Sequence, residues 1–324
     1  MINHLYTVSA AGYDPVVNLA AESVLFEKAE KNTMIFYLWQ NDNTIVIGRN
    51  QNYYRECRLK ETAADHVKIV RRPSGGGAVY HDRGNLNFTF IADDENFDIP
   101  RQTGVILKAL EKKEIRAEFS GRNDLLVNGH KFSGNAYYHH NGFSYHHGTL
   151  LIDSDLSKAQ KYLNPDPLKL KANSVSSVRS RIMNLKEADP SLNIEEMKTL
   201  LLQACEEEYG IRADQIDFPD CVELREYTDK YGSDEWIRGK NPPFDLEIKE
   251  RFQWGSIVLR FTVKKGTVSS VTASSDAMEQ DEILKISELL TGCEFSSGAL
   301  SEALKNQGSL ILDDLAVWLK EQEL

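Results

Sequence analysis

Three consecutive glycines, Gly75 to Gly77, constrain this chain more than any other stretch of its sequence. The segments before and after them have the composition of β-strands. Glycine has no side chain to pack and loses more backbone entropy on ordering than any other residue. The run therefore indicates either backbone that must adopt φ > 0 or admit a ligand, or a flexible hairpin loop.

The residues beside the glycines favour a site for an anion. Main-chain N–H groups of such a loop can converge on a phosphate or carboxylate oxygen. The preceding Arg71 and Arg72 can each offer a planar fork of donors to the same kind of group. The segment is neither GxxxxGK[ST] nor GxGxxG, so the P-loop and dinucleotide-binding motifs are excluded.

The charge distribution is consistent with a small anionic ligand. A formal net charge of −11, from 38 Lys and Arg against 49 Asp and Glu, argues against broad nucleic-acid binding. From Arg49 to Arg83, however, eight Lys or Arg residues face only four acids. This basic segment either lines a binding site for an anion or forms a solvated basic face.

Composition places the chain among ordinary globular proteins. Its start has no basic residues followed by an apolar run, and its most apolar stretches are too short to span a bilayer. The four cysteines form no CxxC pair, which argues against a disulfide framework and a cysteine-based zinc site. We expect a cytoplasmic protein that binds neither membranes nor nucleic acid.

Periodicity and turn signals predict a mixture of strands and helices. Strands are expected at 34–39, 44–47, 68–72, 78–81 and 86–91, and a hairpin at 252–261 and 268–272. Helices are expected at 13–31, 53–64, 101–115, 156–163, 194–209, 281–290 and 297–304, with a last one through Trp318. The pairs Asn128-Gly129 and Asn141-Gly142 predict two hairpin turns between short strands.

The order of these elements predicts an α+β protein with a mixed sheet. Strands and helices follow each other without regular βαβ spacing, which argues against a Rossmann domain. The pattern of predicted elements changes after Asn241-Pro242-Pro243. We therefore expect a large domain at 1–246 and a small α+β domain at 247–324.

A second informative segment is centred on Lys131. This lysine follows an Asn-Gly turn and precedes small residues, so a ligand can approach it closely. Its compact ammonium group suits oxygens that gain negative charge in acyl-phosphate chemistry, although a solvated hairpin lysine is the simpler interpretation. Asp124 can help to hold Mg²⁺ on ATP, or is a plain turn residue.

Four histidines, at 139, 140, 146 and 147, raise the question of a metal site. No cysteine or further histidine lies near enough in sequence to complete typical spacing. We interpret most of them as exposed strand or loop residues, with His147 as a possible orienting hydrogen-bond partner.

Taken together, the two segments resemble the lipoate–protein ligase A family. The first fits RRxxGGGxVxHDxG and the second, with His147 and Leu151, fits KxxGxAx₁₀HxxxL, every fixed position being occupied. Further similar pieces are spread over nearly the whole chain: Tyr13-Asp14-Pro15, Gly48-Arg49, Gly121-Arg122-Asn123-Asp124, Ser177-Val178-Arg179-Ser180-Arg181 and Arg251-Phe252-Gln253-Trp254-Gly255.

This resemblance implies a biotin/lipoyl ligase-type catalytic domain, a mixed sheet flanked by helices, and a small accessory domain. It implies that lipoic acid and ATP with Mg²⁺ give lipoyl-AMP, which then acylates a lysine of an acceptor. The implied acceptors are lipoyl domains of 2-oxoacid dehydrogenase complexes or the glycine cleavage H protein. The implied nucleotide and lipoyl contacts are Arg72, Gly77, Ala78, Val79, Tyr80 and Lys131. To these we add Gly75, Gly76, Asn85, Asn123 and His147, with Asp124 for Mg²⁺ and Lys131 as the catalytic residue.

Three alternatives remain at this point. An ATP-independent octanoyl or lipoyl transferase needs a nucleophile, usually cysteine, and none lies between Cys57 and Cys205. A biotin ligase has a different glycine- and arginine-rich loop. A non-catalytic module that binds lipoate or lipoyl domains has no need of the charged pair Arg72 and Lys131.

Overall fold

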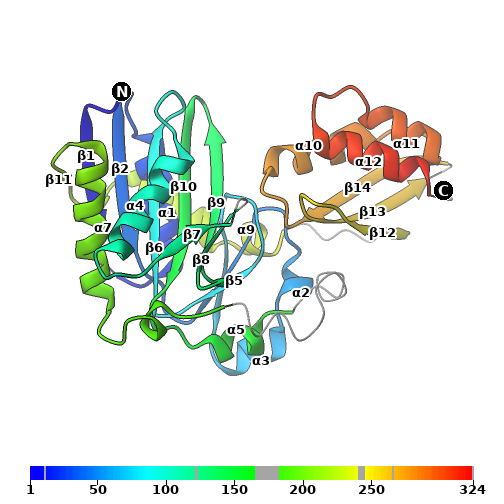
Figure 1. Ribbon diagram of the computed structural model, residues 1–324. Coiled ribbons are helices and arrows are strands. Elements are labelled where there is room, and N and C mark those ends of the chain that lie inside the picture. Colours follow the sequence, from blue (N-terminus) through cyan, green and yellow to red (C-terminus); the bar gives the residue numbers. More distant parts are fainter. Residues whose placement is uncertain (11, 121–122, 165–181, 240–244, 265, 323–324) are drawn as a thin grey trace.

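A mixed eight-stranded sheet forms the centre of the large domain (Figure 1). The computed structural model describes residues 1–10, 12–120, 123–164, 182–239, 245–264 and 266–322. The strand order is β11-β1-β2-β6-β10-β9-β8-β7. Parallel pairing joins β11, β1 and β2, and antiparallel pairing joins the strands from β2 to β7. The strands are β1 (His4–Ser9), β2 (Thr33–Trp39), β6 (Asn85–Asp93), β7 (Ala117–Phe119), β8 (Asp124–Val127), β9 (His130–His140), β10 (Phe143–Leu151) and β11 (Asp214–Gln215).

Helices cover both faces of this sheet. On one face lie α4 (Ile99–Glu111) and α7 (Ile194–Tyr209), and on the other lie α1 (Pro15–Glu27) and α8 (Val222–Gly232). The shorter helices are α2 (Tyr53–Glu56), α3 (Leu59–Ala64), α5 (Leu156–Tyr162) and α9 (Asp234–Arg238), with a 3₁₀ turn η2 (Leu185–Glu187).

The central strand β2 is apolar on both faces because each face packs against helices. In β2, Met34, Phe36 and Leu38 join the core under α4 and α7. The alternate residues of this strand join the core under α1 and α8. The period-2 alternation of a strand thus converts an unbroken apolar sequence into two cores.

A small sheet carries the glycine segment. It consists of β4 (Lys68–Arg71), β3 (Thr44–Ile47) and β5 (Val79–His81), in the order β4-β3-β5. Strand β3 is parallel to β4 and antiparallel to β5. The chain must therefore cross from one side of β3 to the other between Arg71 and Val79, and the glycines lie in this crossing.

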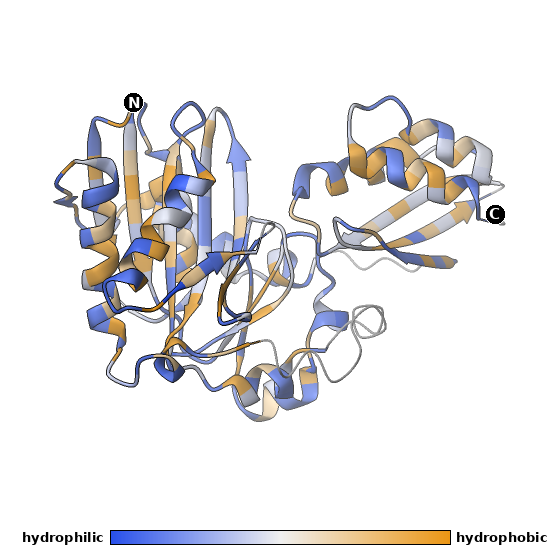
Figure 2. Ribbon diagram, viewed as in Figure 1, coloured by the Kyte–Doolittle hydropathy of each residue, from blue (hydrophilic) through white to orange (hydrophobic). Residues whose placement is uncertain are grey.

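The C-terminal domain has its own sheet and its own hydrophobic core. Its antiparallel strands are β12 (Leu246–Arg251), β13 (Ser256–Lys264) and β14 (Thr267–Ser275). Helices α10 (Gln280–Leu290), α11 (Ser297–Leu304) and α12 (Leu310–Lys320) pack on this sheet. Figure 2 shows hydrophobic residues concentrated on these helices and on the central strands of the large sheet.

Most elements predicted from the sequence are present. Asp14 caps α1, with Pro15 as its first residue, and left-handed Gly210 ends α7. Both residues of each Asn-Gly pair have positive φ, as a two-residue hairpin turn requires. The predicted α+β class with a mixed sheet is confirmed.

Some boundaries were wrong. The predicted helix 53–64 is two helices, because Cys57 has extended backbone that ends α2. Strand β13 begins at Ser256 rather than at 252, after a turn closed by Phe252 and Gly255. Strands β1, β11 and β12 and helices α8 and α9 were not predicted. The predicted domain boundary near 246 stays a prediction, and Gly121-Arg122, 177–181 and 241–243 lie outside the described residues.

Candidate active site

A cavity of about 430 Å³ lies between the large domain and the C-terminal domain. The large domain contributes the glycine loop and Val46, parts of β8, β9 and β10, and an apolar end with Leu19 and Trp39. The C-terminal domain contributes Arg251, Trp254, Gly255, Asp276 and Met278. The cavity therefore collects residues from both segments singled out in the sequence.

The predicted site residues divide into two groups. Those that border the cavity are Arg72, Gly76, Gly77, Ala78, Val79, Asn123, Asp124, Lys131 and His147. Gly75, Tyr80 and Asn85 are not among its lining residues. The binding role of each residue in either group stays a prediction.

Arg72 shapes the glycine loop from within. Its buried guanidinium donates to the carbonyl oxygens of Val46 (3.2 Å), Gly75 (2.6 Å) and Gly77 (2.8 Å). Burial lowers the pKa of Arg72 to about 10, so the side chain stays protonated at neutral pH. A cation bound to a carbonyl oxygen polarises the attached peptide, which strengthens the N–H of the next residue as a donor.

The interpretation of Arg71 as an anion-binding fork was wrong. Its guanidinium donates to five main-chain carbonyls, those of Gly48, Arg49, Gln51, Trp236 and Ile237. The side chain is buried and does not border the cavity, so its donors serve the main chain in this arrangement. Arg71 instead ties β4 to the Gly48–Gln51 turn and to α9.

The glycines allow three stretches of backbone to meet. A Cβ on Gly48 would lie 2.1 Å from the carbonyl oxygen of Gly76, and one on Gly75 would lie 2.4 Å from that of Ala277. Gly76 has φ of +91°, and its N–H donates to the Ala277 carbonyl at 2.9 Å. Gly75 therefore packs against the C-terminal domain, while Gly76 and Gly77 border the cavity.

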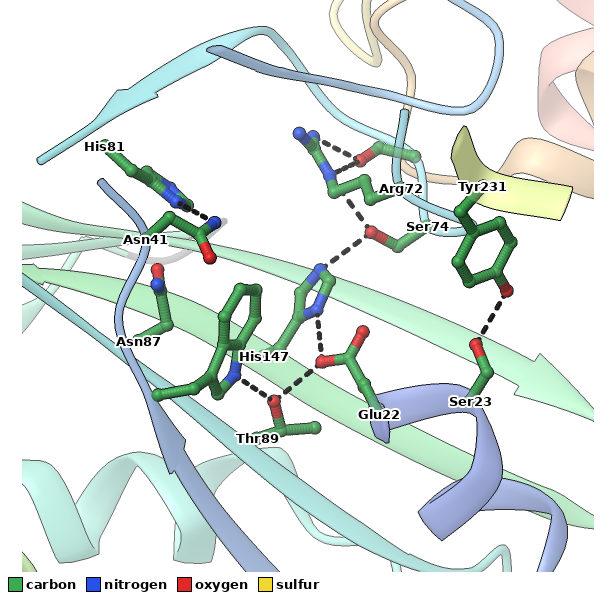
Figure 3. A network of polar contacts seen from close by, with 12 residues as sticks. Glu22, Ser23, Asn41, Arg72, Ser74, His81, Asn87, Thr89, His147 and Tyr231 are labelled. Carbon is green, nitrogen blue, oxygen red and sulfur yellow. Dashed lines mark hydrogen bonds and ion pairs between the residues drawn. The ribbon is translucent and has the colours of Figure 1, made fainter. Parts of the chain in front are cut away.

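A buried polar chain leads from α1 to the glycine loop (Figure 3). The Glu22 carboxylate contacts Nδ1 of His147 at 2.8 Å, and Nε2 of His147 contacts the Ser74 hydroxyl at 2.7 Å. Arg72 Nε donates to the same hydroxyl at 3.1 Å, and Thr89 donates to Glu22 at 2.7 Å. The Glu22 carboxylate orients the His147 imidazole, and this series of hydrogen bonds holds the glycine loop in place over β10.

Lys131 and Asp124 form an ion pair that also borders the cavity. Their Nζ and Oδ1 atoms are 2.6 Å apart, and each side chain is about one-third exposed (35% and 32%). A Cβ on Gly134 would lie 3.0 Å from the Lys131 Nζ atom, so this glycine makes room for the ammonium group. The pair thus presents a lysine at the cavity surface.

His81 and Asn87 are polar residues of the cavity wall that the sequence interpretation missed. The amide of Asn41 lies 3.2 Å from Nδ1 of His81, and Asn87 accepts from Asn85 at 2.9 Å. In the described structure, Nε2 of His81 and Nδ2 of Asn87 are buried without a partner. Burial, and then the charge of Arg72, lowers the pKa of His81 to about 3, so the ring is neutral.

The expectation that most of the four histidines are exposed was wrong for His146, whereas His147 was expected to orient a partner and contacts Glu22 and Ser74. His146 and His147 are buried, because β10 lies inside the sheet with both faces covered. His139 and His140, at the end of β9, are largely exposed. Among the described residues, no three His, Cys, Asp or Glu side chains are grouped as a metal site would require.

The comparison with known families decides what kind of protein this is. The model for the "Lipoyl protein ligase A/B catalytic domain" matches residues 14–206. The chain belongs to this family. The model for the "Bacterial lipoate protein ligase C-terminus" matches residues 241–319. The resemblance drawn from the sequence motifs is therefore confirmed, and the family and fold are those of ligase-type enzymes of protein lipoylation.

Solved structures with this fold include ligand complexes. Plasmodium falciparum LipL1 in complex with lipoate has a TM-score of 0.88 and 28% identity, over 98% of this chain and 100% of its own. A bipartite lipoate protein ligase from Thermoplasma acidophilum has a TM-score of 0.65 and 22% identity, over 76% and 100%. Lipoate-protein ligase A bound with ATP has a TM-score of 0.62 and 22% identity, over 74% and 99%. The last two show the fold alone.

Several cavity residues of this lipoyl protein ligase family member gave no usable signal in the sequence. Leu19 and Trp39 lie in a predicted helix and a predicted strand and were not singled out, and they pack in the core beside the cavity. Arg251 and Asp276, 3.1 Å apart, belong to the C-terminal domain, whose position cannot be read from motifs. The similar segment 251–255, noted for the resemblance, was the one hint that this domain reaches the site. No helix in the described part of the chain is long and apolar enough to cross a membrane.

Proposed function

We propose that this protein activates lipoate with ATP to lipoyl-AMP and transfers the lipoyl group to a lysine of an acceptor lipoyl domain. The observation that carries the proposal is the cavity itself, which joins Lys131, the glycine-loop backbone and an apolar end in one space. A fatty acid with a charged head needs such a combination. Two of the similar structures are complexes with lipoate and with ATP, the two substrates proposed here.

The first half-reaction brings two anions together. A carboxylate is a poor acyl donor, and its attack on the α-phosphate of ATP gives a mixed anhydride and releases pyrophosphate. The Lys131 ammonium, at the cavity surface, offsets the repulsion between the carboxylate and the phosphate. Arg72 acts through the peptides that it polarises, whose N–H groups belong to Gly76 and Ala78. The N–H of Gly76 becomes available to a ligand when it leaves the Ala277 carbonyl.

The apolar end of the cavity suits the aliphatic tail. Leu19, Trp39, Val46 and Val79 border it, and no charged side chain stands among these four. Holding the tail there places the carboxylate near Lys131, and this positioning supplies much of the rate acceleration in such reactions. His81 Nε2 and Asn87 Nδ2 add polar groups that a ligand atom can satisfy.

Mg²⁺ accompanies ATP in this proposal. Asp124 supplies one carboxylate in the cavity, with Oδ1 bound by Lys131 and its other oxygen left for a cation. Mg²⁺ usually combines one or two carboxylates with waters and substrate phosphates, so a single acid fits. The ion would neutralise phosphate charge, while Asp124 also fixes the position of Lys131.

In the second half-reaction, the amino group of the acceptor lysine attacks the acyl carbon and AMP leaves. No enzyme nucleophile is required. In the described structure no cysteine borders the cavity, and burial raises the pKa of the Cys57 thiol to about 12. A thioester route through an ATP-independent transferase therefore has no nucleophile in place. The acceptors we propose are lipoyl domains of 2-oxoacid dehydrogenase complexes or the glycine cleavage H protein.

ATP–pyrophosphate exchange tests this function directly. The purified protein is assayed with lipoate, octanoate, biotin or no acid. We expect exchange with lipoate or octanoate and none with biotin or without acid. Absence of exchange with every acid, in a protein shown to be folded by circular dichroism, rejects the adenylation and favours a transferase or a binding module.

A further inference from the structure

A second cavity, of about 350 Å³, shares no lining residue with the first. It borders the glycine loop at Pro73 and lies between α1, α8 and α9 of the large domain and α10 of the C-terminal domain. Its walls are aromatic: Phe26, Tyr138, Tyr145, Tyr227, Tyr231 and Trp236. Such a wall suits a flat organic group.

Two cations in this cavity have no acid partner. The Arg49 guanidinium lies 4.2 Å from the centre of the Trp236 ring, and the Lys230 ammonium lies 4.9 Å from it. Neither side chain makes an ion pair or a hydrogen bond with any residue that the structure describes. Arg49 is half-buried, and a guanidinium with five donors in such a place normally has acceptors.

A comparison with two other arginines shows that Arg49 is unusual. Arg71, next to it in space, has five carbonyl acceptors. Arg83 also stacks on an aromatic ring, at 4.5 Å from Tyr13, but its charge is paired with Asp42 at 2.8 Å. Stacking on a ring therefore does not by itself leave an arginine without a counter-charge.

A buried hydroxyl also lacks a partner. Tyr145 is only 1% exposed, and no group in the described structure hydrogen-bonds to its hydroxyl. The neighbouring Tyr231 is satisfied, because its hydroxyl lies 2.6 Å from that of Ser23. A buried tyrosine hydroxyl generally has a partner, so Tyr145 retains an unused donor beside the cavity.

The two acids of this cavity are not bound to the cations. Glu27 accepts a hydrogen bond from Tyr227, and Asp281 lies in the first turn of α10. Both acids are exposed, and among the described residues neither forms an ion pair with Arg49 or Lys230, although the charge of Asp281 acts on Arg49 from a longer distance. The donors of the two cations are therefore available to another anion.

We propose that this cavity is a second ligand site, for an aromatic or other planar organic anion that carries a carboxylate or phosphate group. Arg49 and Lys230 bind the anionic group, and the ring lies between the aromatic walls. The occupant contacts α10 as well as the large domain, so it favours the arrangement of the two domains seen here.

Calorimetric titration of the whole protein tests the site with three matched probes, namely benzoate, phenyl phosphate and neutral benzyl alcohol. We expect at least one of the two anions to bind, and benzyl alcohol to bind at least tenfold more weakly. Arg49→Met and Lys230→Met should each weaken binding roughly tenfold, as loss of one charged hydrogen bond predicts. Arg83→Met, which removes a stacked but paired arginine, should leave the affinity unchanged.

The first cavity must be excluded as the site of binding. Lys131→Met disables that cavity and should leave the affinity for the anion unchanged, whereas loss of binding in this variant overturns the proposal. Equal affinity for benzyl alcohol, or unchanged affinity in both Arg49→Met and Lys230→Met, overturns it as well. Tyr145→Phe keeps the ring and should weaken binding, with thermal unfolding as the check that each variant is folded. None of these results depends on whether lipoyl-AMP is formed.

Discussion

Single residues hold the charges of the active site by two different means. Arg72 is buried, and carbonyl oxygens of its own loop satisfy it, so its charge organises backbone. Lys131 is partly exposed and has one carboxylate partner, so it can exchange that partner for a substrate oxygen. Binding a ligand to Lys131 therefore requires little free energy, because the lysine only exchanges one partner for another. Displacing Arg72 would leave three carbonyl oxygens without this donor.

Replacing Lys131 by alanine should abolish adenylate formation without unfolding the protein. We expect lipoate-dependent ATP–pyrophosphate exchange to fall by roughly 100-fold or more, because a positioned charge is lost where negative charge gathers. Stability should change by no more than about 1 kcal/mol, since an ion pair this exposed contributes little. Lys186→Ala, which breaks the exposed 2.6 Å pair with Asp153, is the matched control and should retain full exchange. A folded, active Lys131→Ala protein would show that this lysine is not catalytic.

Two buried histidines should make the protein sensitive to acid. Burial lowers the pKa of both His81 and His146 to about 3. As the pH decreases below about 6.5, these histidines become protonated in the unfolded chain but stay neutral in the folded protein. The free energy of unfolding therefore decreases as the pH is lowered, down to about pH 3. Each histidine should contribute a slope of up to about 1.4 kcal/mol per pH unit in this range and none above it.

Urea unfolding between pH 5 and pH 8 measures this slope. His146→Gln keeps a neutral hydrogen-bonding side chain beside Gln102 and should reduce the slope below pH 6 by about the share of one histidine. His140→Gln, at the exposed end of β9, is the control with the slope of the unaltered protein. Identical slopes in all three proteins would contradict the assignment of a neutral, buried His146.

At the residue scale, the sequence predicted which residues come together where a local motif fixes their position, and their roles stay predictions. Lys131, Asp124 and the central glycines border the cavity as their motifs indicated. Tyr80 does not, because its hydroxyl turns to Asn43 at 3.0 Å and its ring joins another core. Which face of a short strand carries a side chain depends on register, and a motif without register cannot decide it.

At the scale of elements, the conformation of the glycine loop depends on its contact with the Gly48–Gln51 turn. Gly48 follows β3, and any side chain there would run into the Gly76 carbonyl. Arg71 fastens the same turn through the carbonyl of Gly48 at 2.9 Å. The conformation of the loop is therefore set from outside as well as by its own glycines.

Gly48→Ala should distort the loop and weaken lipoate binding by at least roughly tenfold, because the added methyl group displaces the Gly76 backbone. Gly104→Ala is the matched control, since nothing lies within 4 Å of its added Cβ in α4. There alanine should be neutral or stabilising by about 0.5–1 kcal/mol, as helix propensity predicts. Calorimetry with lipoate measures both variants, and unchanged affinity in Gly48→Ala would remove the link between turn and loop.

The elements found from the sequence are those whose pattern is imposed by a core. The strand 34–39 is buried on both faces and shows as an unbroken apolar run, and the helix 101–115 shows an apolar stripe because one side of it is buried. Helix α8 has only Tyr231 buried, and its sequence therefore lacks an apolar stripe. Its place is fixed by packing on α1, including the Ser23–Tyr231 contact, which joins residues 208 positions apart.

For the whole molecule, the cavity proposed as the active site is completed by residues of the C-terminal domain. Contacts between described residues that hold it against the large domain include the hydrogen bonds from Gly76 N–H to the Ala277 carbonyl and from Ser275 N–H to the Asn50 carbonyl (3.0 Å). The Asn50 amide also donates to the Gln280 carbonyl at 3.0 Å, and Arg55 forms an ion pair with Glu247 at 3.3 Å. Residues of the same domain border the cavity. An acceptor lysine must reach the acyl carbon in this cavity, which motivates the hypothesis that the small domain moves during the cycle.

Asn50→Asp should loosen this interface, because the amide donor to Gln280 becomes a carboxylate that faces a carbonyl oxygen. We expect a larger radius of gyration by X-ray scattering for this variant without ligand. Asn43→Asp is the matched control, since the amide of Asn43 donates to the Asp65 carbonyl at 3.0 Å within the large domain. Its scattering should match that of the unaltered protein.

The same measurement with lipoyl-adenylate decides whether the motion belongs to the cycle. If the adenylate takes the N–H of Gly76 as its own donor, the contact with Ala277 is lost and the scattering curve must change. Identical curves with and without the adenylate would mean that the acceptor lysine enters a closed arrangement. The cavity would then have to be open on a side that the C-terminal domain does not cover. In that case Asn50→Asp should leave the rate of lysine acylation unchanged, whereas a required opening predicts faster acylation once the interface is weakened.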